Sequence, residues 1–245
     1  MKNIKYLKIN VLCLQLMVFL LLNLTCYAQE QKTLKVDYSK IEKFVKSNDN
    51  QFEQLITRFE SGDTTLTLED IANIYYGSFY STNYSYVDAS KSLKDKMKEK
   101  DYANAFILCK EELKQSPASL DLLFKASICA QETDISEDIY SQRIVQILDV
   151  IFASGDGRSE NTAYKVVAVS DEYFIIYAVF GANLKAQALV GHCDVMTVYE
   201  DEALDETVDL YFDVSLHLSQ LDAIFGGSLS KSKKADKKSR VKSKK

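Results

Sequence analysis

Apolar side chains recur every three or four residues in the part of the chain that follows residue 36, which is the period of an amphipathic helix. Between residues 41 and 59 the recurring positions are Ile41, Phe44, Val45, Phe52, Leu55, Ile56 and Phe59. They predict two short helices, with a break or a cap at Asp49-Asn50. Thr67 followed by Asp70 has the order of an N-cap and an acidic third helical position, so a further helix should begin there and end at Gly77.

A second helical stretch has a more specific spacing. Its characteristic residues are Asp101, Tyr102, Ala105, Cys109, Leu113 and Pro117. This order resembles the second helix of a tetratricopeptide (TPR) repeat, and Leu120 to Ala130 resembles the first helix of a following repeat, although Glu112 replaces the usual alanine. A further helix should begin at Ser136 and end at Gly155. Because a solenoid needs about three repeats to be stable, this TPR-like helix pair must pack against other elements.

The C-terminal part has a different pattern, with short segments rich in Val and Tyr that partly alternate with polar residues. The predicted strands are Tyr164 to Val169, Lys185 to Val190, Val195 to Tyr199, and Asp209 to Leu218. A short helix should begin at Ser170-Asp171-Glu172 and end at Gly181. Close strand spacing favours antiparallel pairing. The predicted fold class is therefore α+β, with a helical part over residues 36–153 and a small antiparallel sheet with a short helix over residues 160–225.

The N-terminus is basic and then apolar. Three lysines among the first eight residues precede an apolar run over residues 11–24, which is shorter than the ~20 residues of a membrane span. Cys26 and Ala28 supply the small side chains that signal peptidases require before a cut. We therefore expect a cleaved signal peptide, a mature start near Gln29, no transmembrane span after cleavage, and a periplasmic or secreted protein. A retained anchor or a lipid on Cys26 is the alternative.

Charge is strongly segregated along the chain, whose formal net charge is −5. Residues 230–245 carry +8 and residues 1–28 carry +3, which leaves −16 for residues 29–229. Residues 230–245 are highly charged and contain few apolar residues, so burial cannot offset the entropy lost on ordering them. We therefore predict that this basic tail is disordered. Such a tail could fold back on the acidic body, bind an anionic surface or polyanion, or serve only solubility.

Composition points to one module and to no cofactor. The chain has one Pro and eight Gly, which excludes long linkers and favours a single module over residues 29–229. Cys109, Cys129 and Cys193 remain after removal of the signal peptide. Cys109 and Cys129 could pair in an oxidising compartment, but burial as free thiols is the preferred interpretation. No cysteine or histidine spacing indicates a metal.

A cluster of aromatic residues surrounds Gly77. It comprises Tyr75, Tyr76, Phe79, Tyr80, Tyr84 and Tyr86. Tyrosine combines a rigid apolar face with a polar tip, so the five tyrosines could form an interaction surface. The alternative is a loop that packs on the helices and keeps its hydroxyl groups in water. This structural interpretation is the preferred one.

Candidate catalytic residues are few. Adjacent His192, Cys193 and Asp194 would point to opposite faces of an extended segment, so a turn between two strands is the better interpretation. The glycines in Ser154-Gly155-Asp156-Gly157 follow a helix and lack the ending of a phosphate loop. The acidic run from Glu200 to Asp209 lacks the calcium-ligand spacing of an EF-hand. If the chain is an enzyme, the candidates for its site are Asp156, Asp171, His192 and Asp213, converging where helices meet the sheet.

Four short strings, taken together, resemble one protein family. They are Asp63 to Thr67 leading to Tyr75-Tyr76-Gly77, Ser154-Gly155-Asp156-Gly157, Asp171-Glu172-Tyr173, and Tyr211 to Ser215. Their order and spacing are similar to domain of unknown function 4919, a group of secreted proteins typical of Bacteroidetes, over roughly residues 36–225. This resemblance implies an exported single module and transfers no catalytic residue.

These features favour a non-catalytic module that binds a protein or a cell-envelope component through its helical part. A hydrolase-type enzyme with a site where helices meet the sheet, and an envelope tether that acts through the basic tail, are the alternatives. No specific nucleic-acid binding is expected.

Overall fold

The computed structural model describes residues 33–85, 89–136 and 138–224. The chain divides into two units, Met1–Thr33 and Leu34–Lys245, and the fold described here is that of the second. The predicted signal peptide, the basic tail and Tyr86 lie outside the described residues. The helices of the N-terminal part are α2 (Tyr38–Ser47), α3 (Asp49–Glu60), α4 (Leu68–Gly77), α5 (Lys91–Lys98), α6 (Tyr102–Gln115), α7 (Leu120–Glu132) and α8 (Asp138–Ala153).

Local capping signals fix where α2 and α4 begin. The Asp37 carboxylate accepts the Lys40 amide at 3.1 Å, which satisfies one of the unpaired amides at the start of α2. At α4, the Thr67 hydroxyl accepts the Asp70 amide, and the Asp70 carboxylate accepts the Thr67 amide at 2.9 Å. This reciprocal cap confirms the start predicted from the sequence.

Gly77 has a different role from the one that the sequence predicts. It is the last residue of α4, but it does not have the positive φ of a left-handed helix stop. A Cβ at this position would lie 2.9 Å from both Phe52 Cε2 and Val45 Cγ2. Gly77 therefore lets α4 pack closely against α2 and α3.

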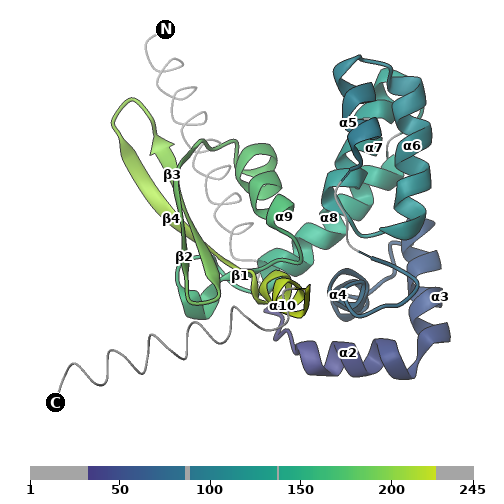
Figure 1. Cartoon of the computed structure of the whole chain (residues 1–245), viewed down its shortest axis with the longest axis horizontal. Coiled ribbons are helices and arrows are strands. Elements are labelled where there is room, and N and C mark those ends of the chain that lie inside the picture. The colour runs from purple at the N-terminus through teal and green to yellow at the C-terminus, as the bar shows by residue number, and fades with distance from the viewer. Residues whose placement is uncertain (1–32, 86–88, 137, 225–245) are drawn as a thin grey trace, which may run out of the picture. The chain divides into compact units, whose positions relative to one another are not determined.

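The helices α5 to α8 pack in sequence order, with α6 against both α5 and α7, and α7 against α8 (Figure 1). Small residues lie fully buried between them, including Ala105, Ala126 and Ala130. Short side chains allow the helix axes to approach each other. The boundaries of α6, α7 and α8 lie close to those predicted, whereas α5 is a helix that the sequence patterns do not predict. The resemblance of this group to a TPR repeat stays a prediction.

The C-terminal part contains a four-stranded sheet with the order β1-β4-β3-β2. Its elements are β1 (Tyr164–Lys165), α9 (Val169–Phe174) continued by a π-helical turn (Ile175–Val179), β2 (Leu184–Val190), β3 (Cys193–Asp201), β4 (Glu206–Asp213) and α10 (Ser215–Ile224). β3 pairs antiparallel with both β2 and β4, and β1 pairs parallel with β4 through Tyr164 and Phe212. The sheet is therefore mixed, with one short parallel edge added to the predicted antiparallel strands.

Two of the predicted strands are shorter than expected. The first ends at Lys165, since residues 169–174 already form α9. The last ends at Asp213, where the carboxylate accepts the Ser215 amide at 3.0 Å and starts α10. Alternating apolar residues continue beyond Asp213, but the side-chain cap redirects the backbone.

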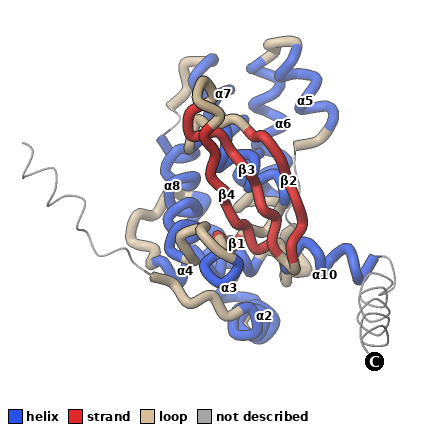
Figure 2. The backbone as a smooth tube through the Cα atoms, turned by 90° about the vertical axis from the view of Figure 1, so that its left-hand side faces the viewer, coloured by secondary structure: helices blue, strands red, loops and turns tan. Residues whose placement is uncertain are grey.

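One hydrophobic core connects the helices with the sheet. It includes Phe52 and Ile56 from α3, Leu123 from α7, and Met196 and Phe212 from the sheet, all at 0 or 1% exposure. Figure 2 shows the strands beside the helices that supply this core. The α+β fold class is confirmed. Among the described residues, every helix is too short or too polar to span a bilayer.

Candidate functional site

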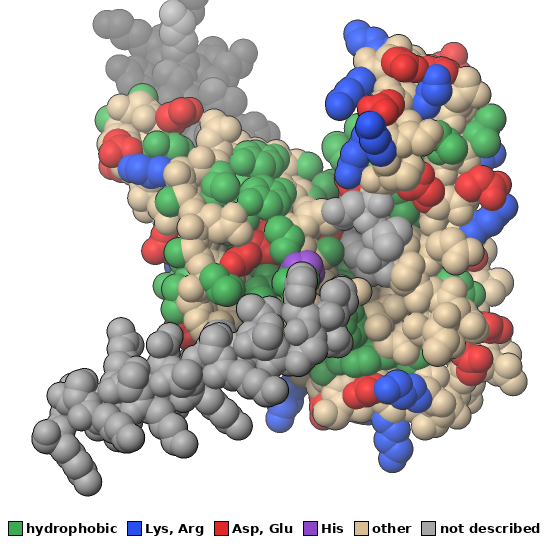
Figure 3. All heavy atoms as spheres, in the orientation of Figure 1, with side chains coloured by type: hydrophobic (Ala, Val, Ile, Leu, Met, Phe, Trp, Pro, Cys, Tyr) green, Lys and Arg blue, Asp and Glu red, His purple; other side chains and the backbone are tan. Residues whose placement is uncertain are grey.

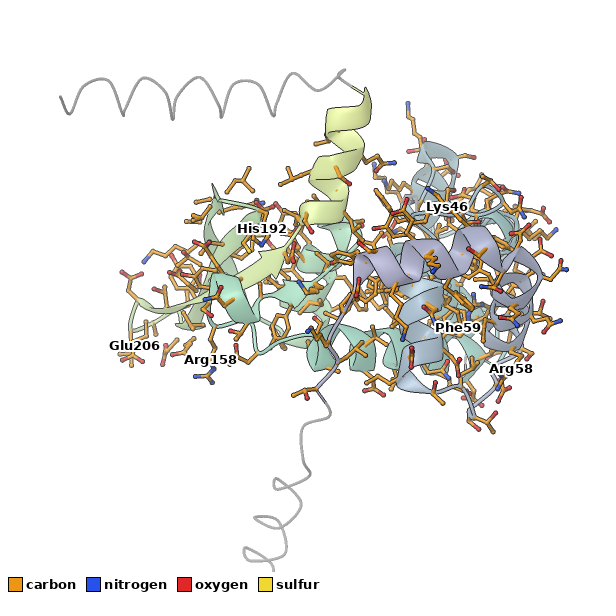
Figure 4. The ribbon with its side chains drawn as sticks, turned by 90° about the horizontal axis from the view of Figure 1, so that it is seen from below. Lys46, Arg58, Phe59, Arg158, His192 and Glu206 are labelled. Atoms are coloured by element: carbon orange, nitrogen blue, oxygen red, sulfur yellow. The ribbon has the colours of Figure 1, made fainter. Side chains whose placement is uncertain are left out.

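The four catalytic candidates fall into two groups. Asp171 and Asp213 are buried at 0 and 4% exposure where α9 and β4 meet the helical part, and both act electrostatically on the Tyr76 hydroxyl. Asp156 and His192 are not buried. His192 lies at the turn between β2 and β3, where its backbone carbonyl accepts the Val214 amide (Figure 4). The structure thus brings Asp171 and Asp213 into one buried region and leaves the other two in contact with solvent.

The predicted interaction surface requires a correction at its first two tyrosines. Tyr75 and Tyr76 are both 0% exposed, so they cannot belong to an interaction surface. They lie on the inner face of α4, where their hydroxyl groups reach the C-terminal part of the chain. Tyr80 and Tyr84 are half-buried, with Tyr84 packed edge-on against Phe52.

Tyr75 holds α4 to the start of α9. Its hydroxyl group donates to Asp171 Oδ2 at 2.6 Å and accepts the Val167 amide at 3.1 Å. The same carboxylate oxygen accepts the Ala168 amide at 3.2 Å, as an acidic residue does in the first turn of a helix. These bonds join segments far apart in sequence and satisfy polar groups that burial would otherwise penalise.

We expect Tyr75→Phe to lower the free energy of unfolding by about 2 kcal/mol, because it removes the donor to a buried carboxylate and the acceptor of the Val167 amide. Chemical denaturation followed by circular dichroism measures the change. Tyr80→Phe, at a half-buried position, serves as the control and should cost less than about 0.5 kcal/mol. Equal losses in both variants would contradict the role given to the Tyr75 hydroxyl.

Lys165 and Asp213 form an ion pair at the parallel edge of the sheet. Lys165 Nζ lies 2.5 Å from Asp213 Oδ2, and the Lys165 carbonyl accepts the Tyr76 hydroxyl at 3.1 Å. Burial alone would raise the pKa of Asp213, but the hydrogen bonds from Lys165 and Ser215 outweigh it and lower the pKa below its usual value. Asp213 therefore stays ionised and its charge is compensated.

Glu172 and Asp194 form a second pair of acids, between α9 and β3. Glu172 is 0% exposed and Asp194 is 8% exposed. Among the described residues, no donor reaches either carboxyl oxygen of Glu172, whereas the Asp194 carboxyl lies within hydrogen-bonding reach. A hydrogen bond between two carboxyl groups requires a proton on one of them. Burial, and then the charges of Asp194 and Asp171, raise the pKa of Glu172 to about 9, so Glu172 carries that proton at neutral pH.

Polar side chains continue from this pair toward the surface. Gln187 on β2 donates to Asp194 Oδ2 at 3.0 Å and accepts the Tyr173 hydroxyl at 2.7 Å. No local pattern marks Glu172 as a functional residue, and Asp194 stands out in the sequence only as part of the turn at His192 and Cys193. The raised pKa depends on burial beneath α9, which only the tertiary structure shows.

The remaining candidate motifs have structural roles. The amides of Asp156 and Gly157 both donate to the Thr162 carbonyl, at 2.9 and 2.8 Å, so they are not available to a phosphate. The acidic residues from Glu200 to Asp209 surround the exposed tip of the β3–β4 hairpin (Figure 3). Within the described ranges no three His, Cys, Asp or Glu side chains are arranged to hold a metal ion.

Among the described residues, Cys109, Cys129 and Cys193 are buried free thiols, in agreement with the interpretation preferred from the sequence. Burial raises the pKa of the Cys109 thiol, and the neighbouring Cys129 raises it further. Burial also raises the pKa of Cys193, to about 11. Protonated, buried thiols are poor nucleophiles, so these residues do not form a reactive site.

Two of the hollows that described residues line are open to solvent and adjoin α9. One of about 400 Å³ lies between the end of α4 and α10, where Ser78, Tyr84, Val167, Ser170 and His217 line it. The other, of about 520 Å³, lies between α7 and α9 and its π-helical continuation. We call the second hollow the α7–α9 groove. Its residues are Asp121, Phe124, Lys125, Val169, Ser170, Tyr173, Phe174, Tyr177 and Ala178.

These features define an α+β protein with buried acids and an aromatic groove between its helical and sheet parts. The chain matches the family model of a domain of unknown function (DUF4919) over residues 39–222, and it belongs to this family. Neither a curated protein nor a solved structure matches it.

Proposed function

We propose that the protein is an exported, non-catalytic module that binds another protein of the cell envelope through the α7–α9 groove. The observation that carries this proposal is the group of aromatic side chains left exposed in the groove. Phe124 is 38% exposed and Tyr177 is 50% exposed. Figure 3 shows hydrophobic side chains gathered on the surface over α9, beside the hollow that separates α9 from the α5–α7 helices.

The aromatic rings of the groove are held in place before any partner arrives. Tyr173 and Tyr177 stack with an interplanar angle of 12°, one helical turn apart. Phe124 packs edge-on against Phe174 across the groove, with ring centroids 5.2 Å apart. Rigid aromatic side chains bind with little loss of conformational entropy, which is why tyrosine and tryptophan dominate the energetics of protein interfaces.

The groove suits an apolar side chain from a protein partner. Among the described residues that line it, the only charged side chains are Lys125 and Asp121, and these form an ion pair with each other within α7. Fixed tyrosine hydroxyl groups at the rim can accept or donate hydrogen bonds to a partner backbone. The two walls come from the helical part and from α9, in keeping with the TPR-like character expected for α6 and α7.

The buried acids favour binding over catalysis. A general acid or base must reach the proton that it transfers, at about 2.6–3.2 Å or through one water molecule. Asp171 and Glu172 are 0% exposed, and Asp213 is paired with Lys165. No substrate can approach these carboxyl groups unless α9 moves away from the sheet.

Export is part of the same proposal. Cleavage after Ala28 would leave Gln29 as the first residue, in a compartment where envelope proteins are available as partners. The +8 tail at residues 230–245 would then add a salt-sensitive attraction to anionic envelope polymers. Intact mass measurement of the protein from its native host should give a chain that begins at Gln29, and an intact Met1 on a cytosolic chain would contradict export.

Capture from detergent-solubilised envelope fractions tests the groove. We expect the double variant Phe124→Ser and Tyr177→Ser to capture at least about tenfold less partner than the unaltered chain, because both exposed aromatic side chains of the groove are lost. The matched control is Ile107→Ser with Val145→Ser, two apolar residues that are 54 and 55% exposed on α6 and α8. Equal capture by the two double variants, with both shown to be folded by circular dichroism, would contradict the proposal.

A further inference from the structure

The β2 strand forms one edge of the sheet (Figure 2). Its seven residues, Leu184–Val190, pair only with β3 among the described strands. All of them except Leu184 are exposed, with Leu189 at 53% and Val190 at 42%. No described residue forms a backbone ladder on its outer side. A strand in this position offers unpaired amides and carbonyls to another extended chain.

The outer part of β2 lacks the usual protection of an edge strand. Proteins block strand edges with charges, proline, bulges or very short strands. The opposite edge is protected in this way, because β1 has only two residues. In β2 the bulge and the one charge both lie at Lys185, and the five residues from Ala186 to Val190 contain no charge, glycine or proline.

Opposite charges mark the two ends of this strand. Lys185 lies at the N-terminal end, where it forms an exposed ion pair with Asp205 at 2.6 Å, with side chains 36 and 71% exposed. Exposed pairs of this kind contribute about 0–1 kcal/mol and exchange partners readily. Glu160 lies at the C-terminal end, since a methyl group on Gly191 would be 3.5 Å from Glu160 Oε2. Glu160 is exposed, and no ion pair within the described part of the chain includes it.

We infer that β2 is the docking edge for a second copy of this chain, so that two β2 strands pair antiparallel about a twofold axis. In such a pair the N-terminal end of each strand meets the C-terminal end of the other. Lys185 then faces Glu160 of the partner subunit, and this contact occurs twice. The two sheets become one continuous sheet, and both copies of Leu189 and Val190 lie next to the new strand pair.

Charge reversal at the two ends tests this arrangement without altering the core. Sedimentation velocity of the purified chain should show a dimer that grows with concentration. Lys185→Glu or Glu160→Lys alone should each weaken association at least about tenfold, because each places like charges together twice. A mixture of the two single variants should restore the dimer, since both contacts of the mixed dimer again join one acidic and one basic side chain. This recovery also demonstrates that both variants are folded.

Two further variants separate the edge from other surfaces. Leu189→Lys should abolish association, because it places a charge at the outer edge of β2, whereas Leu204→Lys, at a residue 66% exposed in the β3–β4 turn, should leave it unchanged. A chain that stays monomeric at all concentrations would overturn the inference. A dimer that survives Leu189→Lys, or a mixture of the two charge variants that stays monomeric, would overturn it as well. These results are independent of the α7–α9 groove, whose variants leave β2 unaltered.

Discussion

Gly155→Ala is expected to lower the free energy of unfolding by about 3 kcal/mol or more, the upper range for inserting a methyl group into a packed site. A Cβ at this position would lie 2.2 Å from the Thr162 carbonyl oxygen and 2.6 Å from the Ala163 carbonyl oxygen. Both obstacles are backbone atoms, which cannot rotate away as a side chain does. The Thr162 carbonyl also accepts the amides of Asp156 and Gly157, so moving it breaks the turn that leads into β1.

Gly181→Ala is the informative comparison for this prediction. Gly181 has a φ of +62°, but no atom of the described residues lies within 4 Å of the Cβ that alanine would add. Its cost should therefore be only the dihedral strain of about 1 kcal/mol. Urea unfolding of both variants separates the two effects. A loss at Gly155 no greater than that at Gly181 would show that the turn relaxes, and would remove the steric explanation.

Gly155 also shows what the sequence can and cannot predict. Its place after a helical pattern correctly predicts that the helix ends nearby, because a break in periodicity and a glycine are local signals. The reason that only glycine fits is a contact with residues 162 and 163, which no local pattern reveals. The same holds for Gly77, whose neighbours Val45 and Phe52 come from other helices.

Elements with local signals can be predicted from this sequence, whereas elements fixed by distant pairing cannot. The caps of α4 and the end of the π-helical turn at Gly181 follow from residues a few positions away. The parallel pairing of β1 depends on β4, nearly fifty residues further along the chain, as the register of Lys165 with Asp213 shows. Strand pairing of this kind is set by tertiary contacts rather than by propensity.

The sequence predicts the buried acids only in part, for the same reason. Asp171 and Asp213 are candidates because they are acidic residues expected to converge where helices meet the sheet. Glu172, next to Asp171, differs from any solvated glutamate only through its environment. That environment consists of the charge of Asp194 on β3 and the burial of Glu172 on the inner face of α9. It alone decides the protonation state.

Glu172→Gln is expected to stabilise the protein at neutral and alkaline pH, by about 4–5 kcal/mol at pH 8. The unfolded chain releases this proton near the usual pKa of 4.5, whereas the folded protein keeps it up to a pKa of about 9. The contribution of Glu172 to stability is therefore fully present below pH 4.5 and declines as pH rises toward 9. Glutamine resembles the protonated acid in shape, can donate to Asp194, and releases no proton on unfolding.

The difference between the variant and the unaltered chain isolates this effect from all other titrations. Thermal unfolding across pH 4 to 9 should give nearly equal stabilities at pH 4 and a gap that widens steadily with pH. Glu200→Gln, at an exposed position on β3, should change stability by less than about 0.5 kcal/mol at every pH. A gap that does not depend on pH would mean that Glu172 is ionised in the folded protein. The buried acid pair would then need a cation to compensate it, and because no positive charge acts on Glu172 among the described residues, that cation would have to come from outside them.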